Sequence, residues 1–452
     1  MRPDLGVLVQ SVGHLSDYRR SGVADPTGTE QFLRAAAASV LDNNWLGSST
    51  APSRSLYPHQ WSWDSAFIAL GLRHLSPQRA QRELRTLFDA QWSDGRVPHI
   101  VFNPATPPEA YFPGPAFWRA GNTSGIVQPP VHALAVWEVH RADLEESQRT
   151  AFLRTMYPKL AAWHRYLRTR RDFGGRGLVS IVHPWESGMD NSPAWDRPLS
   201  RVTPIDATDF TRRDLEHGAA ADRPTDADYG RYIRLAAGYR DLGYQDSRWP
   251  TFADTFAVED PGFNALFATA EHVMAEIATE LGWPILAAEH RANAGRVTDA
   301  LVNTLWDKES GFFFPHDVLV GGLVPQFSCS GLVPLMLPDL PVAGELLQTA
   351  SGPRFGLGIA LGVPSYDLTA ADFDPAKYWR GPAWFNVGWL VHRGLLTHGE
   401  RAHARRLRSD LLDTAWRTDF AEYADPLTGE GHGARAFGWT AALTLDLLSQ
   451  VE

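Results

Sequence analysis

The sequence predicts an all-α protein whose helices form a barrel of six helix pairs, the (α/α)6 toroid, with a cap over one end. Apolar residues recur at three- and four-residue spacing in about twelve segments, which is the period of amphipathic helices. No sequence repeat of fixed period is present, which argues against an open solenoid. Polar and aromatic motifs fall between the helical segments, as they would if the loops opened at one end of a closed barrel. We therefore predict one barrel domain over residues 1–452.

The predicted helices follow one another along almost the whole chain. They cover residues 29–43, 64–75, 77–91, 129–141, 148–171, 225–242, 262–281, 286–306, 341–350, 382–397, 400–418 and 438–450. Several begin at a typical start signal, because proline is favoured in the first turn of a helix. These signals are Ser76-Pro77, Pro129-Pro130 and Pro224-Thr225.

Short β-prone pieces interrupt the helices. The segment GLVSIVHPW (177–185) predicts a strand that leads into an acidic loop, and GFFFPHDVLVGGLVP (311–325) predicts a hairpin with glycine at its turn. The irregular stretches 93–127 and 186–222 exceed the usual length of a loop, and such long loops tend to be functional lids. We expect the cap to consist of insertions at roughly 93–127 and 177–222.

Composition limits the partners of the chain. Of its 452 residues, 44% are hydrophobic and 21% are charged, which is ordinary for a globular protein, and the net charge is −10. This acidic balance argues against nucleic acid or an anionic membrane as a partner, and the basic run RAHARRLRSD (401–410) is interpreted as a solvated helix face. No stretch reaches the roughly 18 uncharged apolar residues that a membrane span requires.

Cysteine usage and the first residues predict the compartment. Cys329 is the only cysteine, which excludes an intramolecular disulfide and fits a reducing environment. The segment MRPDLGVLVQSVGHL (1–15) contains no long apolar run of a secretory signal, so we expect a cytoplasmic protein. The histidines His99, His183 and His432 lack metal-ligand spacing, and no phosphate-binding or dinucleotide fingerprint is present. Neither a metal nor a cofactor is expected.

Tryptophan is the unusual component of this sequence. The 17 tryptophans cluster in polar, loop-like contexts. Sugars present apolar C–H faces that stack on aromatic rings, although large helical proteins also use tryptophan to fill gaps between helices. For an isolated tryptophan gap filling is the better interpretation. For Trp61 and Trp63, which stand next to Ser62 and Asp64, sugar binding is the better one.

The loop HPWESGMDNSP (183–193) offers two candidates for a general acid, Glu186 and Asp190. Burial near apolar rings and a neighbouring carboxylate both raise the pKa of a carboxyl group, which suits a group that must donate a proton. An alternative is that Asp190 caps the loop through backbone amides, which would lower its pKa. The local pattern alone leaves these possibilities open.

A second acidic loop, FAEYADPLTGEGHG (420–433), offers a general base. Asp425 precedes a proline and is expected to close an Asx turn, and Glu430 lies between glycines in an exposed context. Glu422, at the junction of helix and loop, is best placed to face inward. Two carboxyl groups on loops rich in tryptophan are what cleavage of a glycosidic bond requires, because one must stay protonated and the other ionised.

Two further motifs place polar groups at helix starts. Asp64 in LYPHQWSWDSAF (56–67) falls in a first helical turn, where its charge complements the helix dipole, and the aromatic residues around it favour hydrogen bonding to a sugar. The segment YWRGPAWFNVGW (378–389) repeats this arrangement. Arg223, which precedes a helix in DRPTDADYGRY (222–232), would suit a carboxylate ligand, although a surface arginine is the commoner interpretation.

Taken in order, these motifs resemble those of glycoside hydrolase family 63, and within it the bacterial mannosylglycerate and glucosylglycerate hydrolases. The resemblance runs over nearly the whole chain. It is carried by YPHQWSWDSAF, GRVPHIVFNP, SGIVQPPVHA, HPWESGMDNSP, RPTDADYGRY, YWRGPAWFNVGW and FAEYADPLTGEGHG. The acid loop and the YWRGPAW block are the most specific of these motifs.

The resemblance implies a capped (α/α)6 barrel and hydrolysis with inversion, with Asp190 as general acid and Glu422 as general base. It also implies that Arg223 and Tyr229 bind the glycerate carboxylate, and His99 is predicted to bind substrate as well. The residues implied to line the sugar subsite are Tyr57, Trp61, Trp63, Asp64, Gln128, Tyr378, Trp379 and Trp384. The implied partner is a small sugar with a carboxylate aglycone, and such enzymes are often homo-oligomers.

Three other functions are compatible with parts of this sequence. A member of the same family could act on neutral short α-gluco-oligosaccharides, with Arg223 in a structural role. Sugar 2-epimerases also use helical barrels, but with pairs of histidines, and the acidic loops argue against that class. A non-catalytic carbohydrate-binding module would tolerate the loss of either carboxylate. The motifs do not decide between glucose and mannose.

Overall fold

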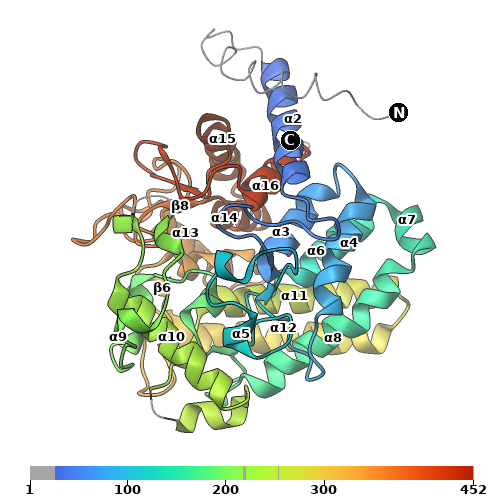
Figure 1. The fold of residues 1–452 in the computed structure, drawn as a ribbon. Helices are drawn as coiled ribbons and strands as arrows, with labels where there is room; N and C mark the ends of the chain where they lie inside the picture. Colours follow the sequence, from blue (N-terminus) through green and yellow to red (C-terminus); the bar gives the residue numbers. More distant parts are fainter. Residues whose placement is uncertain (1–25, 217–219, 253, 451–452) are drawn as a thin grey trace.

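The computed structural model describes residues 26–216, 220–252 and 254–450. Within this part of the chain, six helices form a closed inner ring in which each packs against the next and the last packs against the first. In ring order they are α3 (Ser62–Leu72), α6 (His132–Ala142), α11 (Pro261–Glu280), the 3-10 helix η8 (Cys329–Met336), α14 (Phe385–Thr397) and α16 (Gly438–Leu448). The predicted (α/α)6 barrel is confirmed, and Figure 1 shows these inner helices gathered around its centre.

A second layer of helices surrounds the ring. It consists of α2 (Pro26–Asn43), α4 (Pro77–Asp89), α8 (Phe152–Arg170), α12 (Pro284–Leu305), α13 (Ala343–Ser351) and α15 (Arg401–Thr418), each packed on inner helices adjacent in the chain or across the closure of the ring. Sequence explains the two layers. Every residue of α3 and α16 is buried, and both are apolar nearly all round, whereas α4 buries one stripe that includes Leu84 and Phe88.

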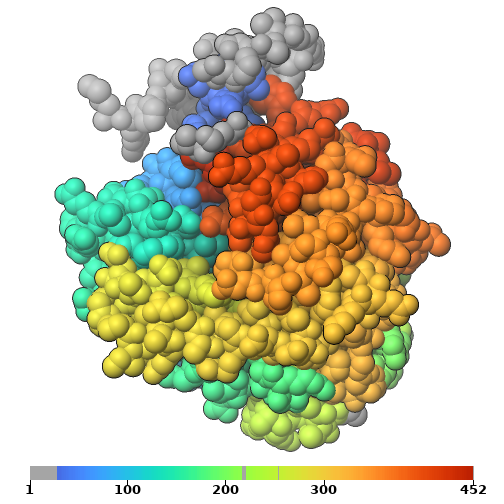
Figure 2. All heavy atoms as spheres, turned by 180° about the vertical axis from the view of Figure 1, so that it is seen from behind, coloured from blue at the N-terminus to red at the C-terminus, as the bar shows by residue number. Residues whose placement is uncertain are grey.

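The connections differ between the two ends of the barrel. The chain passes from an inner to an outer helix by short links, such as Leu72 to Pro77 and Glu280 to Pro284. It returns from an outer to an inner helix by long links, and these carry the polar motifs. The amino ends of the inner helices therefore all lie at the end that carries the long loops. Figure 2 shows the opposite side of the molecule, covered largely by the second half of the chain.

All twelve predicted helical segments are helices, with boundaries that shift by a few residues. The start at Ser76 is confirmed, because its hydroxyl accepts a hydrogen bond from the Arg79 amide. The segment 382–397 begins later than predicted, at Phe385, after the short strand β8 (Ala383–Trp384). The inner helix η8 is not among the predicted segments, because CSGLVPLM has no polar face and contains Pro334.

The β-prone pieces are confirmed as short strands. Strand β3 (Ser180–Ile181) leads into the acidic loop and pairs with β4 (Val258–Glu259), which pairs with β7 (His316–Asp317). The predicted hairpin closes by a bridge from His316 to Leu323, with Gly321 and Gly322 at positive φ in its turn. The remaining strands are β1 (Gln60–Trp61), β2 (Ile100–Val101), β5 (Trp306–Asp307), β6 (Phe312–Phe313), β9 (Tyr423–Ala424) and β10 (Gly431–His432).

The two predicted cap insertions contain little regular structure. They hold the short helices α5 (Pro115–Trp118) and α9 (Asp196–Leu199), and the longer helix α10 (Asp226–Asp241) follows them. Figure 1 shows the segment with α5 crossing in front of the inner helices. Residues 1–15, for which no secretory signal is predicted, lie outside the described residues. Among the helices that the structure describes, none combines the length and the apolar character needed to cross a bilayer.

Candidate active site

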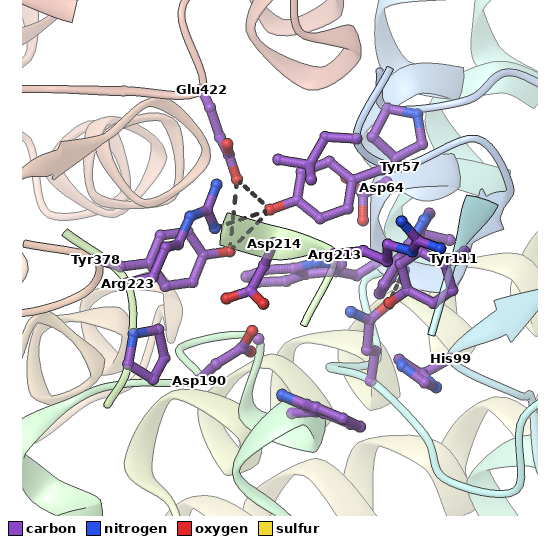
Figure 3. Close-up of a pocket in the computed structure, with 18 of the residues that line it drawn as sticks. Tyr57, Asp64, His99, Tyr111, Asp190, Arg213, Asp214, Arg223, Tyr378 and Glu422 are labelled. Carbon is purple, nitrogen blue, oxygen red and sulfur yellow. Dashed lines mark hydrogen bonds between the residues drawn. The ribbon is translucent and has the colours of Figure 1, made fainter. Parts of the chain in front are cut away.

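A pocket opens at the loop-bearing end of the barrel, and side chains from five of the long connections, including both cap insertions, line it (Figure 3). Eleven of the thirteen predicted site residues form its wall. They are Tyr57, Trp61, Trp63, Asp64, His99, Gln128, Asp190, Arg223, Tyr229, Tyr378 and Glu422. Residues separated by more than 300 positions in the sequence thus meet in one cavity.

Glu422 is held in place by three donors. The Tyr57 hydroxyl donates to its Oε1 at 3.0 Å, and the Tyr378 hydroxyl lies 3.4 Å from the same oxygen. The Ala434 amide donates to Oε2 at 3.0 Å. Burial raises the pKa of this carboxyl group above its usual range, while the Arg223 charge and these hydrogen bonds oppose that shift. The net shift is upward, and the three hydrogen bonds hold the carboxyl group in a fixed orientation.

Asp190 occupies the opposite side of the cavity, as Figure 3 shows. Its side chain is half-buried, and its backbone carbonyl accepts a hydrogen bond from the Tyr232 hydroxyl at 2.9 Å. Burial, followed by the negative charge of Glu422, raises the pKa of Asp190 to about 8. This direction is opposite to the one expected for an aspartate that caps a loop through backbone amides. Asp190 therefore carries a proton at neutral pH.

Glu186, the rival candidate for the acid, has a different environment. Its side chain is fully buried and forms a two-point ion pair with Arg171, at 2.7 and 2.8 Å. Its oxygens also accept hydrogen bonds from the amides of Val127 at 3.1 Å and Val182 at 2.7 Å. Because both oxygens are engaged, Glu186 is a structural group that ties the acid loop to the segment before Gln128.

The other two candidates for the general base, Asp425 and Glu430, take different positions. The Asp425 side chain accepts hydrogen bonds from the amides of Leu427 at 2.6 Å and Thr428 at 3.2 Å, which is the predicted Asx turn. Glu430 is exposed, as expected. Of the three carboxylates in this loop, Glu422 alone lines the pocket that contains Asp190.

Arg223 is not a surface residue. It is 6% exposed, it lies over the Tyr378 ring at 4.6 Å, and its Nη1 donates to the Tyr57 hydroxyl at 3.4 Å. Its Nη2 has no hydrogen-bond partner within the described part of the chain, nor do the indole nitrogens of Trp61 and Trp439. Three buried donors in the pocket wall are therefore open to acceptor oxygens of a ligand, since buried polar groups in native proteins rarely stay unpaired.

The other predicted polar residues take defined positions. Asp64 lies in the first turn of α3 as predicted, and burial, with the nearby charge of Glu422, holds the pKa of its carboxyl group well above the usual range. The side-chain oxygen of Gln128 accepts a hydrogen bond from the Trp63 amide at 3.2 Å. The Tyr229 hydroxyl donates to the carbonyl of Phe112 at 3.2 Å, which ties α10 to the first cap insertion.

The placement of Trp379 and Trp384 differs from the prediction that they line the sugar subsite. Their rings stack in parallel, 3.8 Å apart, and each is about 1% exposed. Trp384 packs behind the rings of Tyr378 and Tyr423, at 5.0 and 4.6 Å. Trp379 has a left-handed backbone, with φ of 59°, in the turn that brings its ring onto Trp384. The pair supports the pocket wall from behind and does not form its surface.

Several lining residues are not among the predicted site residues, although Trp185 belongs to the acid loop that the sequence singles out. From the cap insertions come Tyr111, Phe112, Trp185, Arg213 and Asp214, and from other segments come Tyr232, Phe437 and Trp439. The unusual length of the two insertions predicts that these segments are functional, but it does not identify which of their residues line the pocket. Trp439 lies in the first turn of the apolar helix α16 and resembles an ordinary core residue.

Gly433 provides a test of how closely Glu422 must be placed. Its φ is +69°, and a Cβ built there would lie 2.5 Å from Glu422 Oε2, 2.6 Å from Tyr423 Cε1 and 2.9 Å from Glu422 Cβ. We expect Gly433→Ala to displace the carboxylate and to reduce kcat on the order of 10²-fold, the loss that small misplacements of catalytic groups cause.

The matched control is Gly429→Ala in the same loop. Gly429 also has a positive φ, of +75°, but its Cβ would meet only Leu361, at 3.2 Å, and the end of the Arg417 side chain, at 3.9 Å. Backbone strain is thus present in both variants, whereas displacement of Glu422 is specific to the first. Equal loss of kcat in the two variants would contradict the importance of the Glu422 position.

An (α/α)6 barrel with a protonated and a hydrogen-bonded carboxyl group facing one aromatic pocket defines the class of protein: a glycoside hydrolase. Residues 57–440 match the model of a family described as the mannosylglycerate hydrolase MGH1-like glycoside hydrolase domain, and the chain belongs to this family.

Relatives support the same assignment. The mannosylglycerate hydrolase of Rubrobacter radiotolerans is 42% identical over 94% of this chain and 98% of that protein. The glucosylglycerate hydrolase of Mycolicibacterium hassiacum is 38% identical over 94% of this chain and 99% of that protein. The crystal structure of the GH63 mannosylglycerate hydrolase from Thermus thermophilus, in complex with Tris and D-glycerate, superposes with a TM-score of 0.85 at 42% identity and covers 92% of this chain and 99% of that one. The resemblance to glycoside hydrolase family 63 is confirmed.

Proposed function

We propose that the protein hydrolyses the α-glycosidic bond of mannosylglycerate or glucosylglycerate with inversion, releasing mannose or glucose and glycerate. The observation that carries this proposal is that Asp190, whose pKa is raised to about 8, and the hydrogen-bonded carboxyl group of Glu422 line one pocket with a buried arginine, Arg223, that keeps one guanidinium nitrogen open. The names of the relatives are consistent with a glycerate aglycone. The proposal includes both mannose and glucose, because relatives of comparable identity are named for each sugar.

In the proposed mechanism, Asp190 donates its proton to the glycosidic oxygen as the bond from that oxygen to the anomeric carbon breaks. Glu422 removes a proton from a water molecule, whose oxygen bonds to the anomeric carbon from the opposite face. Inversion of this kind requires the two carboxyl groups roughly 6.5–9.5 Å apart, with room for the water between them. The hydroxyls of Tyr57 and Tyr378 keep Glu422 aimed at that space.

The proposed subsites follow from the lining. Trp61 and Trp63 offer aromatic faces to the sugar ring, and Asp64 and Gln128 offer hydrogen-bonding groups to its hydroxyls. The glycerate carboxylate is assigned to Arg223, whose planar fork suits a two-point contact with a carboxylate. Tyr229, which also lines the pocket, is assigned to the same subsite.

A substrate screen tests the proposal directly. The purified protein is incubated with mannosylglycerate, glucosylglycerate and a neutral α-glucoside disaccharide, and the anomer released first is followed by NMR. We expect rapid release of the β-sugar from a glyceryl glycoside. Preference for the neutral disaccharide would favour the family member that acts on α-gluco-oligosaccharides, and release of the α-sugar would exclude inversion.

Arg223→Ala tests the assignment of the aglycone. Removing a charged hydrogen bond to a ligand costs about 2–3 kcal/mol, or roughly 30- to 150-fold in kcat/KM. We expect this loss on a glyceryl glycoside and a much smaller one on an uncharged α-glucoside. The ratio of the two kcat/KM values is the measurement, because it cancels general damage to the pocket. Equal losses on both substrates would contradict recognition of a carboxylate.

A further inference from the structure

A second concave site lies at the end of the barrel opposite the active site. It is formed where α3, α14 and α16 end and α15 begins, and Leu396, Thr397 and Ala404 contribute to its wall. Its charged lining is dominated by arginine: Arg73, Arg393, Arg401, Arg405 and Arg408. We call these five residues and the space between them the basic groove. Such a concentration is unexpected in a chain with a net charge of −10.

Part of this charge has a structural explanation. Arg73 pairs with Asp446 at 2.7 Å, and both Arg73 and Arg393 lie near Glu138, at 3.5 and 3.4 Å. Arg408 donates to the carbonyl of Leu447 at 3.0 Å, near the carboxyl end of α16, where a cation opposes the helix dipole favourably. These three arginines therefore stabilise the ends of the inner helices.

Arg401 and Arg405 have no such explanation. Across the residues that the structure describes, neither side chain forms an ion pair or a hydrogen bond, and both are exposed. Arg401 occupies the first turn of α15, where a positive charge is repelled by the helix dipole. Arg405 is four residues further on the same face, so the two like charges destabilise the helix again. Local stability thus disfavours both residues, which is typical of positions retained for binding.

A buried histidine adds an independent observation. His392 lies in the wall of the basic groove, is 2% exposed, and its Nδ1 has no hydrogen-bond partner within the described ranges. Burial lowers the pKa of His392 to about 4, so its ring is neutral at physiological pH and adds no further charge. An unpaired buried nitrogen is uncommon in a native protein, and a polar ligand in the groove would satisfy it.

We propose that the basic groove is a binding site for a small multivalent oxyanion, a molecule that carries two or more phosphate or carboxylate charges. Arg401 and Arg405 contact it from the amino end of α15, whose free backbone amides also favour an anion. Arg393 and His392 contact it from α14. The site is remote from the glycosidase pocket and independent of the substrate assigned there.

The experiment compares pyrophosphate and citrate as probes by calorimetry and thermal denaturation, at constant ionic strength. The test variant is R401Q/R405Q. The matched control is R406Q/R417Q, which removes the same charge from α15, but at residues that lie outside the groove and pair with Asp410 and Asp413. We expect saturable binding of one ion per chain, weakened at least 10-fold in the test variant and unchanged in the control. The stronger probe identifies phosphate or carboxylate as the preferred group.

Two further readouts separate binding from stability. Without a probe, R401Q/R405Q should hydrolyse substrate as the unaltered protein does and should melt at a higher temperature, because an unfavourable charge arrangement is relieved. A lower melting temperature would mean that these arginines stabilise the fold, and it would overturn the proposal. The absence of saturable binding by either probe at millimolar concentration, or equal weakening in both double variants, would overturn it as well.

Discussion

Asp190→Asn should lower kcat on an unactivated glycoside by about 10²- to 10⁴-fold, the range that general acid catalysis contributes. Asparagine has a similar shape but no proton to donate, so KM should change little. A glycoside whose leaving group needs no protonation, such as a nitrophenyl glycoside, should lose far less activity than the natural glycoside. Similar losses on both substrates would mean that Asp190 acts through structure and not as an acid.

The pH profile provides a second measurement on the same variant. In the unaltered protein, activity should fall above pH 8 as Asp190, with a pKa of about 8, loses its proton. It should fall on the acidic side as Glu422 gains a proton, above the ordinary value of 4.5. In Asp190→Asn the alkaline decline should disappear, whereas the acidic one should remain.

Asp190→Asn should lose activity but gain stability relative to the unaltered protein as the pH rises. The pKa of Asp190 is about 8 in the folded protein against about 3.8 for an unperturbed aspartate, so between these values the folded state holds a proton that the unfolded state has lost. Stability contributed by this proton is present below about pH 4 and is lost as pH rises toward 8. Asp190→Asn avoids this loss, so its advantage in urea unfolding should grow from pH 4.5 to pH 8.

Glu422→Gln should have an effect of the same size. Glutamine keeps an oxygen for the Tyr57 and Tyr378 hydroxyls but cannot accept a proton from water, so we expect kcat to fall by about 10²- to 10⁴-fold with little change in KM. The measurement is steady-state kinetics on a glyceryl glycoside. Binding should persist, because the open donors of Arg223 and Trp61 are untouched.

Glu430→Gln is the matched control, since it removes an exposed carboxylate from the same loop. Its kinetics should equal those of the unaltered protein. If Glu422→Gln retained substantial activity, or if Glu430→Gln lost as much, Glu422 could not be the base.

Sequence predicts the barrel well because periodicity reports which face of each helix is buried. It misses η8 because a short, wholly buried segment has no polar face to set a period, and Pro334 interrupts the pattern further. The long connections are likewise visible as insertions, but their irregular backbones give no period from which the direction of Tyr111 or Asp214 could be derived.

Within the site, the sequence predicts which loops are functional more readily than it predicts the role of each residue in them. Glu186 and Asp190 look equivalent in the linear pattern, and only the fold shows that Glu186 meets Arg171, 15 residues earlier in the chain. The same limit applies to Trp379 and Trp384. Their composition suggests an aromatic sugar platform, whereas tertiary packing turns the two rings onto each other behind Tyr378.

The carboxylate of Glu186 has a consequence for protein engineering. It joins two separate connections, through the amides of Val127 and Val182, and it is neutralised by an arginine from a third segment. The acid loop is thus not a portable module. A chimera that imported HPWESGMDNSP into a foreign scaffold without Arg171 would leave an uncompensated buried charge, a defect that costs about 3–5 kcal/mol. Transplants should therefore move residues 171–193 together and provide a backbone amide equivalent to that of Val127.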